Sequence, residues 1–260
     1  MYRAEKISAE YVKEHYLVNN PTCHNCPVAC KKEVEIKDGP WKGLKMESVE
    51  YESAWSLGAN CGIDDMDDVA MLVRLCNAYG LDTIEAGTTI AVAMEAGIAE
   101  FGDGKKAIEL MHEMGKGTPL GRILGAGTDV TAQVFGVVHN PTVKGQSMPA
   151  YEPRAVKGIG ITYATTTMGA DHTAGYAVAT NILKVGGDVD PLKPEGQVEL
   201  SRNLQVATAA IDSTGMCLFI AFAIFDQADT FNALVDLIVA FTGQPLTADD
   251  VTALGNCILI

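Results

Sequence analysis

Three cysteines gather in one short segment, where Cys23, Cys26 and Cys30 follow the spacing C-x2-C-x3-C. Thiolates are soft metal ligands, and the short connections between them allow the sulfurs to converge on one inorganic centre. Three cysteines leave a tetrahedral zinc ion or a cubane iron–sulfur cluster one ligand short. We therefore expect a fourth ligand elsewhere in the chain.

Three kinds of site use closely spaced cysteines of this type. The spacing favours a [4Fe–4S] cluster. Structural zinc is the alternative, although no second C-x2-C or H-x3-H pair follows at the spacing of a zinc finger. Radical S-adenosylmethionine chemistry uses the reverse order, C-x3-C-x2-C, and is disfavoured. Pro27 fixes its own φ and helps to turn the chain around a metal, and His24 reads as an exposed loop residue.

The fourth ligand is left open by spacing alone. Four further cysteines are candidates: Cys61, Cys76, Cys217 and Cys257. Cys217 closes the string Asp212 to Cys217, which is similar to an earlier string from Asn77 to Asp82. Both have the form D/N-x-x-G-L/M-C/D. Read alone, each string is a helix end with a glycine stop.

Composition limits the classes of protein that the chain can belong to. Its 260 residues are 48% hydrophobic, which is enough for one large or two small cores, and its net charge is −14. That charge argues against nucleic acid and against anionic membranes as partners. No apolar stretch is long enough to span a membrane, and the first residues lack an apolar signal core. With seven cysteines, an odd number, the chain is expected to be cytoplasmic.

The pattern of apolar residues indicates a mainly α-helical protein with one small β-hairpin. The hairpin is expected at residues 34–36 and 41–46, on either side of a Gly-Pro turn. Proline and glycine near residues 139–145 predict a boundary between two multihelical domains, 1–140 and 141–260. Helices are expected over 9–16, 64–80, 83–99, 104–114, 120–135 (as one or two), from 153, and over 199–211, 231–241 and 248–255.

Taken together, these strings resemble the tungsten- or molybdenum-containing aldehyde ferredoxin oxidoreductase family. Besides the cysteine segment and the two glycine strings, the resemblance is carried by 51–53 (Tyr-Glu-Ser), 61–63 (Cys-Gly-Ile), 79–84, 149–154 and 169–172. It covers nearly the whole chain. It implies the second and third domains of that family, with the third domain truncated at its C-terminus.

The resemblance also implies cofactors and the residues that hold them. It identifies Cys217 as the fourth ligand, so that Cys23, Cys26, Cys30 and Cys217 would hold a [4Fe–4S] cluster. The two glycine strings would bind the two pyranopterins that carry tungsten or molybdenum. The residues concerned are Asn77, Gly80, Leu81, Asp82, Asp212, Gly215 and Met216. Asn77 stands where aspartate is usual, and Met216 where leucine is usual.

Glu52 and His172 match the family's acid and base beside the metal. The chemistry of aldehyde oxidation independently calls for an acid and a base of this kind. Water must reach the carbonyl carbon, and a carboxylate with a raised pKa can take its proton. A histidine can hydrogen-bond an oxygen and move protons near neutral pH. Without the family, Glu52 would read as a surface carboxylate and His172 as a helix-start or core histidine.

The implied reaction is oxidation of a small aldehyde to a carboxylic acid, with electrons leaving through the cluster to ferredoxin. The family's N-terminal β-rich domain is missing from this chain, so a separate subunit could supply it. The resemblance is also compatible with a homodimer. Two alternatives remain: a non-catalytic iron–sulfur subunit or inactive fragment, and a zinc-stabilised helical interaction domain.

Overall fold

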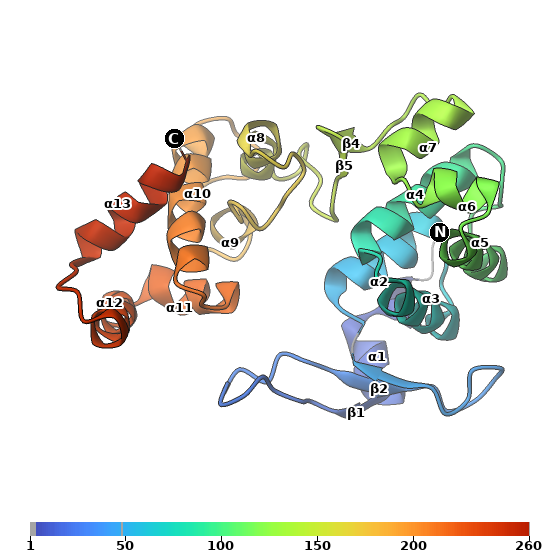
Figure 1. Cartoon of the computed structure of the whole chain (residues 1–260), viewed down its shortest axis with the longest axis horizontal. Helices are drawn as coiled ribbons and strands as arrows, with labels where there is room; N and C mark the ends of the chain where they lie inside the picture. Colours follow the sequence, from blue (N-terminus) through green and yellow to red (C-terminus); the bar gives the residue numbers. More distant parts are fainter. Residues whose placement is uncertain (1–3, 48, 260) are drawn as a thin grey trace. The chain divides into compact units, whose positions relative to one another are not determined.

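The computed structural model describes residues 4–47 and 49–259, and it divides into two compact units, Met1–Ala150 and Tyr151–Ile260. Helices dominate both units and strands are short (Figure 1). The mainly α-helical fold expected from the sequence is therefore confirmed. The proline and glycine near residue 141 lie inside the first unit, where Lys144 and Gly145 turn a small hairpin.

The first unit combines a small antiparallel sheet, in the order β1-β2-β3, with a group of helices. Figure 1 shows α1 beside the sheet and the remaining helices of this unit packed together. In chain order the elements are η1 (Ala4–Ile7), α1 (Ala9–His15), β1 (Leu17–Asn19), β2 (Glu33–Glu35), β3 (Lys45–Glu47), α2 (Tyr51–Leu57), η2 (Ala59–Cys61), α3 (Met66–Tyr79), α4 (Thr83–Glu95), α5 (Gly104–Lys116), α6 (Pro119–Leu124), α7 (Thr128–Phe135), β4 (Thr142–Val143) and β5 (Gln146–Ser147).

Local signals explain where these helices begin and end. Ser8 caps α1 by accepting a hydrogen bond from Tyr11 N at 3.2 Å, and Asp65 caps α3 through Asp67 N at 2.9 Å. Gly80 ends α3 in the left-handed conformation, with φ of 68°. The hairpin expected near residues 34–46 is present as β2 and β3. The structure adds β1, and β4 with β5, which sequence analysis did not predict.

The core of the first unit is one contiguous apolar cluster. α3 and α4 contribute its centre, with Val69, Leu72 and Ile90 fully buried. Cys61 and Cys76 are also fully buried, as expected of cysteines that act as small apolar residues. Burial raises the pKa of both thiols to about 12, which keeps them protonated.

The second unit is organised on the long helix α10, which packs against α8 and α13 (Figure 1). Its elements are α8 (Lys157–Thr165), α9 (Val178–Asn181), α10 (Gln197–Ser213), η3 (Leu218–Ile220), α11 (Ala221–Asp226), α12 (Ala228–Thr242) and α13 (Ala248–Leu259). The helix expected to open at Pro153 begins instead at Lys157, because Ala155 N donates to Glu152 O at 3.0 Å and closes a turn. No described helix in either unit is long and apolar enough to cross a membrane.

Candidate functional site

The three clustered cysteines lie in the exposed loop that joins β1 to β2. Cys23 and Cys30 are exposed, Cys26 is partly exposed, and all three thiols are free. Asn25 and Ala29 adopt left-handed conformations, with φ of 57° and 51°, each directly before a cysteine. A hydrogen bond from Cys26 N to Cys23 O, at 3.0 Å, closes the turn between the first two. The loop therefore makes a tight turn between the first two cysteines, and a second left-handed residue directly precedes the third.

The chemistry of this donor set fits an iron–sulfur cluster. Thiolates are the usual ligands of such clusters, and Cys217 is a further free and exposed thiol. Lys31 and Lys32 follow the third cysteine and place positive charge beside it, although they also pair with Glu47 and Glu50. Among the described residues, no three His, Cys, Asp or Glu side chains stand together as a metal-binding group. The expected convergence of the four cysteines stays a prediction.

Glu52 occupies the first turn of α2, and its carboxylate is half-buried. Its Oε2 accepts a hydrogen bond from Ala150 N at 3.0 Å. Burial raises the pKa of Glu52 to about 7; the Asp82 carboxylate adds to that rise, and the Ala150 hydrogen bond opposes it. A carboxyl group with a pKa near 7 can both release and take up a proton near neutral pH, which suits a general base.

The helix that carries Glu52 is fixed against α4 by hydrogen bonds from two serines. Ser53 Oγ lies 2.9 Å from Thr83 Oγ1, and Ser56 Oγ donates to Thr83 O at 2.9 Å. Gly87 allows this close approach, because a Cβ added there would come within 2.5 Å of the Ser56 carbonyl carbon. Glu52 therefore lies on a helix, α2, whose position is fixed by its hydrogen bonds to α4.

The first glycine string joins two helices. α3 ends at Tyr79, Gly80 turns the chain, and Leu81 N donates to Cys76 O at 2.9 Å. Asp82 is then the N-cap of α4 and accepts from Glu85 N at 2.8 Å. Asn77 and Asp82 are exposed, and Leu81 packs partly against the core.

The second glycine string repeats this design at the end of α10. Gly215 has φ of 75°, and Cys217 is the N-cap residue of η3 but makes no capping bond with its side chain. Partial burial of the carboxyl, with Asp171 nearby, raises the pKa of Asp212. A Cβ added at Gly80 or Gly215 would meet no described atom within 4 Å, so positive φ, not crowding, requires both glycines. That open backbone fits the approach of a flat cofactor.

His172 belongs to a cluster of aromatic rings in the second unit. Its ring centroid lies 5.4 Å from that of Tyr151 and 6.1 Å from that of Tyr176. The two tyrosine hydroxyl oxygens are 2.8 Å apart, and Tyr163 donates to the Tyr151 carbonyl at 3.1 Å. His172 is thus surrounded by groups that can fix its orientation. Glu52 and His172 belong to different units, and their meeting in one cavity stays a prediction.

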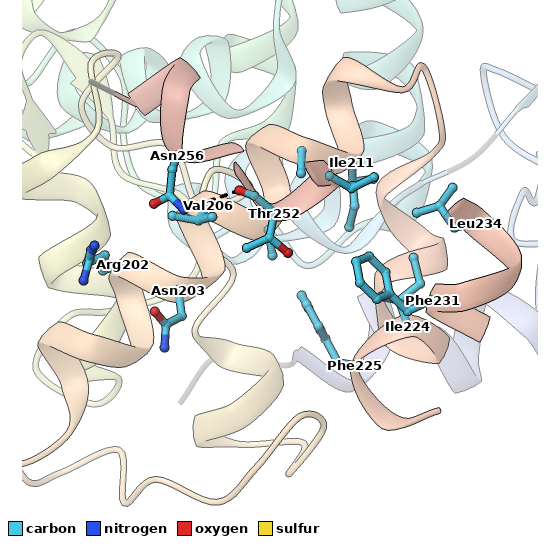
Figure 2. A pocket seen from close by; sticks show the side chains of 13 residues that line it. Arg202, Asn203, Val206, Ile211, Ile224, Phe225, Phe231, Leu234, Thr252 and Asn256 are labelled. Carbon is cyan, nitrogen blue, oxygen red and sulfur yellow. Dashed lines mark hydrogen bonds between the residues drawn. The ribbon is translucent and has the colours of Figure 1, made fainter. Parts of the chain in front are cut away.

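The second unit also has an apolar pocket of about 420 Å³ that sequence analysis did not predict. α10, α11, α12 and α13 line it. In Figure 2, Arg202, Asn203 and Asn256 lie toward one end, and Phe231, Ile224 and Leu234 toward the other. None of the predicted site residues lines this pocket.

Comparisons with known proteins agree with the residue motifs. The family model described as aldehyde ferredoxin oxidoreductase, domains 2 & 3, matches residues 1–260. The tungsten-containing aldehyde ferredoxin oxidoreductase of Pyrococcus furiosus is 33% identical over 269 residues, covering 97% of this chain and 43% of the relative. The protein of the same name from Pyrococcus horikoshii is 32% identical, with the same coverage.

A further relative is named for a different activity. The aliphatic sulfonate oxidoreductase, WOR-like subunit, of Pyrococcus furiosus is 30% identical over 60% of this chain. Among solved structures, the active-site complex BamBC of benzoyl coenzyme A reductase superposes with a TM-score of 0.61 at 14% identity, covering 95% of this chain and 44% of that one. This likeness concerns the fold alone.

The chain spans less than half the length of the aldehyde oxidoreductases that it matches. The cysteine segment, both glycine strings and Glu52 all lie inside the region matched by the family model. The chain belongs to the aldehyde ferredoxin oxidoreductase family, in the part that comprises its second and third domains.

Proposed function

We propose that this chain is the cluster- and cofactor-binding part of an enzyme that oxidises a small aldehyde to a carboxylic acid. The observation that carries this proposal is the half-buried carboxyl of Glu52, with its pKa raised to about 7 and its Oε2 held by the Ala150 N–H. The reaction converts an aldehyde and water to the acid, two protons and two electrons. The cytoplasmic location remains a prediction.

The residues that would hold the cofactors follow from the two glycine strings and the cysteines. The strings at 77–82 and 212–217 would bind the two pyranopterins, and Cys23, Cys26, Cys30 and Cys217 would bind a [4Fe–4S] cluster. A tungsten- or molybdenum-pterin centre bound by these strings would supply two-electron chemistry, and a cluster held by the cysteines would supply one-electron transfer toward a ferredoxin.

Glu52 would take the proton from the water that adds to the carbonyl carbon. At pH 7 a carboxyl with this pKa is about half ionised, so it can accept a proton and then release it to solvent. The Ala150 N–H holds one carboxylate oxygen and limits rotation of the side chain.

His172 would hydrogen-bond the aldehyde oxygen as negative charge develops there. The rings of Tyr151 and Tyr176 pack beside the imidazole and restrict its rotation. An aldehyde held by that bond would present its carbonyl carbon in a fixed direction.

The test is turnover of an aldehyde by the assembled enzyme that contains this chain, carrying Glu52→Gln. The amide keeps the shape of the side chain but cannot take the proton, so turnover should fall by about 10²–10⁴-fold with metal content unchanged. Glu50→Gln is the matched control, because that nearby carboxylate pairs with Lys32 at 3.3 Å and has no proposed catalytic role. Normal turnover by Glu52→Gln would overturn the assignment.

A further inference from the structure

Glu85 makes two hydrogen bonds to backbone groups that lie far from it in the sequence. It occupies the first turn of α4. Its Oε1 accepts from Thr128 N at 2.8 Å, and its Oε2 accepts from Ser147 N at 3.0 Å. One carboxylate thereby joins α4, α7 and the β4–β5 hairpin. Hydrogen bonds to an ionised acceptor are stronger than those between neutral groups.

The surroundings of Glu85 fix its carboxylate to the N-terminus of α7 and to Ser147. Gly127, the N-cap residue of α7, makes no side-chain capping bond, so the Glu85 carboxylate replaces the missing cap. Gly127 has a φ of 98°, and a Cβ added there would lie 2.8 Å from Glu85 Oε1, so a larger residue would be strained and would displace the carboxylate. Ser147 Oγ donates to Thr128 Oγ1 at 2.7 Å, and Thr128 Oγ1 lies 2.9 Å from Thr89 Oγ1.

These hydroxyl groups belong to Thr89, Thr128 and Ser147, whose exposed fractions are 1% or less. Each has a hydrogen-bond partner within the group. A buried and satisfied polar network of this kind fixes one arrangement of its members, because any displacement leaves a donor or an acceptor without a partner. The position of Ser147 is thus set from α4.

Only Met148 and Pro149 separate this anchor from the residue that contacts Glu52. Met148 N donates to Pro141 O at 2.9 Å, and Pro149 restricts the backbone further. Ala150 then presents its N–H to Glu52 Oε2 at 3.0 Å. A displacement at Ser147 is therefore transmitted to this hydrogen bond.

We propose that Glu85 is a positioning residue for Glu52: by fixing Ser147 it holds the Ala150 N–H against the Glu52 carboxylate. The consequence for turnover rests on the proposed function, whereas the structural role does not. α4 fixes both partners of the contact, since Thr83 bonds to the serines of α2 and Glu85 bonds to the hairpin.

The groups around Glu52 shift its pKa in opposite directions, so a measurement of that pKa can test the proposal. Asp82, on α4, raises the pKa of Glu52, and the Ala150 N–H on the hairpin side lowers it. Glu50 is the acidic neighbour that precedes α2. Removing the negative charge of Glu85 by itself would lower the Glu52 pKa or leave it unchanged. Loss of the Ala150 hydrogen bond would raise it. The two effects have opposite signs.

The experiment measures the pKa of Glu52 in this chain by NMR with ¹³C-labelled glutamate, using Glu52→Gln to assign the signal. Glu85→Gln loses one of the two anchoring bonds. Glu85→Asp keeps the charge but is one methylene too short to reach both N–H groups. We expect either change to raise the pKa of Glu52 by about 1 pH unit.

Glu95→Gln is the matched control. Glu95 lies on the same helix and pairs with His139 at 2.8 Å, but it does not contact Ser147. It should leave the Glu52 pKa unchanged. A Glu52 pKa that stays the same or falls in folded Glu85→Asp would overturn the proposal, and this variant decides the matter if Glu85→Gln does not fold. If the Glu52 pKa rises as predicted but the enzyme shows no aldehyde activity, the result counts against the proposed function and leaves the positioning role of Glu85 in place.

Discussion

The cysteine loop and the surroundings of Glu52 belong to the same unit but are organised in opposite ways. The thiols of Cys23 and Cys30 are exposed on a loop between two short strands. Glu52 is half-buried on a helix that is hydrogen-bonded to α4 and to the segment ending at Ala150. The protein itself holds the carboxylate, whereas the thiols lie where solvent and metal can reach them.

This difference teaches which part of the site the polypeptide must build. A proton acceptor that works near neutral pH needs a raised pKa, which burial by neighbouring groups, with the Asp82 carboxylate nearby, provides at Glu52. Thiolates bind metal strongly enough that the metal can order the loop itself, so that binding and local folding are coupled. We infer that the Glu52 region is preformed and that the loop at 23–30 would be ordered by binding of the proposed cluster.

The largest effect is expected from removing one cysteine of the loop. Cys26→Ser should strongly reduce the iron bound after anaerobic reconstitution from about four per chain, because one of the four predicted thiolate ligands is replaced by a poorer oxygen ligand. Cys257→Ser is the control, because this exposed thiol is not a predicted ligand. The Cys257→Ser protein should bind as much iron as the unmodified chain. Iron and sulfide are measured by elemental analysis. Zinc bound without sulfide would instead favour a zinc-stabilised domain.

A smaller effect is expected on the pH dependence of the free energy of unfolding, to which Glu52 contributes. Because burial raises the folded-state pKa to about 7, the folded chain binds more protons than the unfolded chain between about pH 4.5 and 7. Stability that Glu52 contributes as the neutral acid is therefore lost as the pH rises through this window.

Glu52→Gln removes this dependence. It should increase the free energy of unfolding at pH 8 by about 1–2 kcal/mol, after allowance for partial exposure, and change it little at pH 4. Urea unfolding at the two pH values measures the difference. Equal destabilisation at both pH values would mean that folding does not raise the pKa of Glu52. The Glu52 region would then not be a preformed proton-binding site, and the proposed difference from the cysteine loop would fail.

Much of the fold follows from signals that are local in the sequence. Ser8 before α1 and Thr247 before α13 accept capping hydrogen bonds from the first turns, and Gly80 ends α3 in the left-handed conformation. The strands β4 and β5 were missed because each has two residues, too few to show alternation. There, Lys144 and Gly145 form a hairpin turn where the sequence pattern indicated a domain boundary.

The candidate site was predicted less completely for a physical reason. Glu52 could be named from the family resemblance, but its partner Ala150 is 98 residues away and uses only a backbone N–H. Glu85 offers no local signal at all, since an acidic residue in the first turn of a helix is usual. Its role depends on contacts with residues 43 and 62 positions later, which no periodic pattern reveals.

The contrast between the two regions is tested most directly by amide hydrogen exchange on this chain, before and after anaerobic reconstitution with iron and sulfide. We predict that residues 23–30 exchange rapidly without iron and slowly with it, while the amides of Ser147 and Ala150 exchange slowly in both states. A loop that is already protected without iron, or an Ala150 amide that becomes protected only after iron binds, would contradict the account.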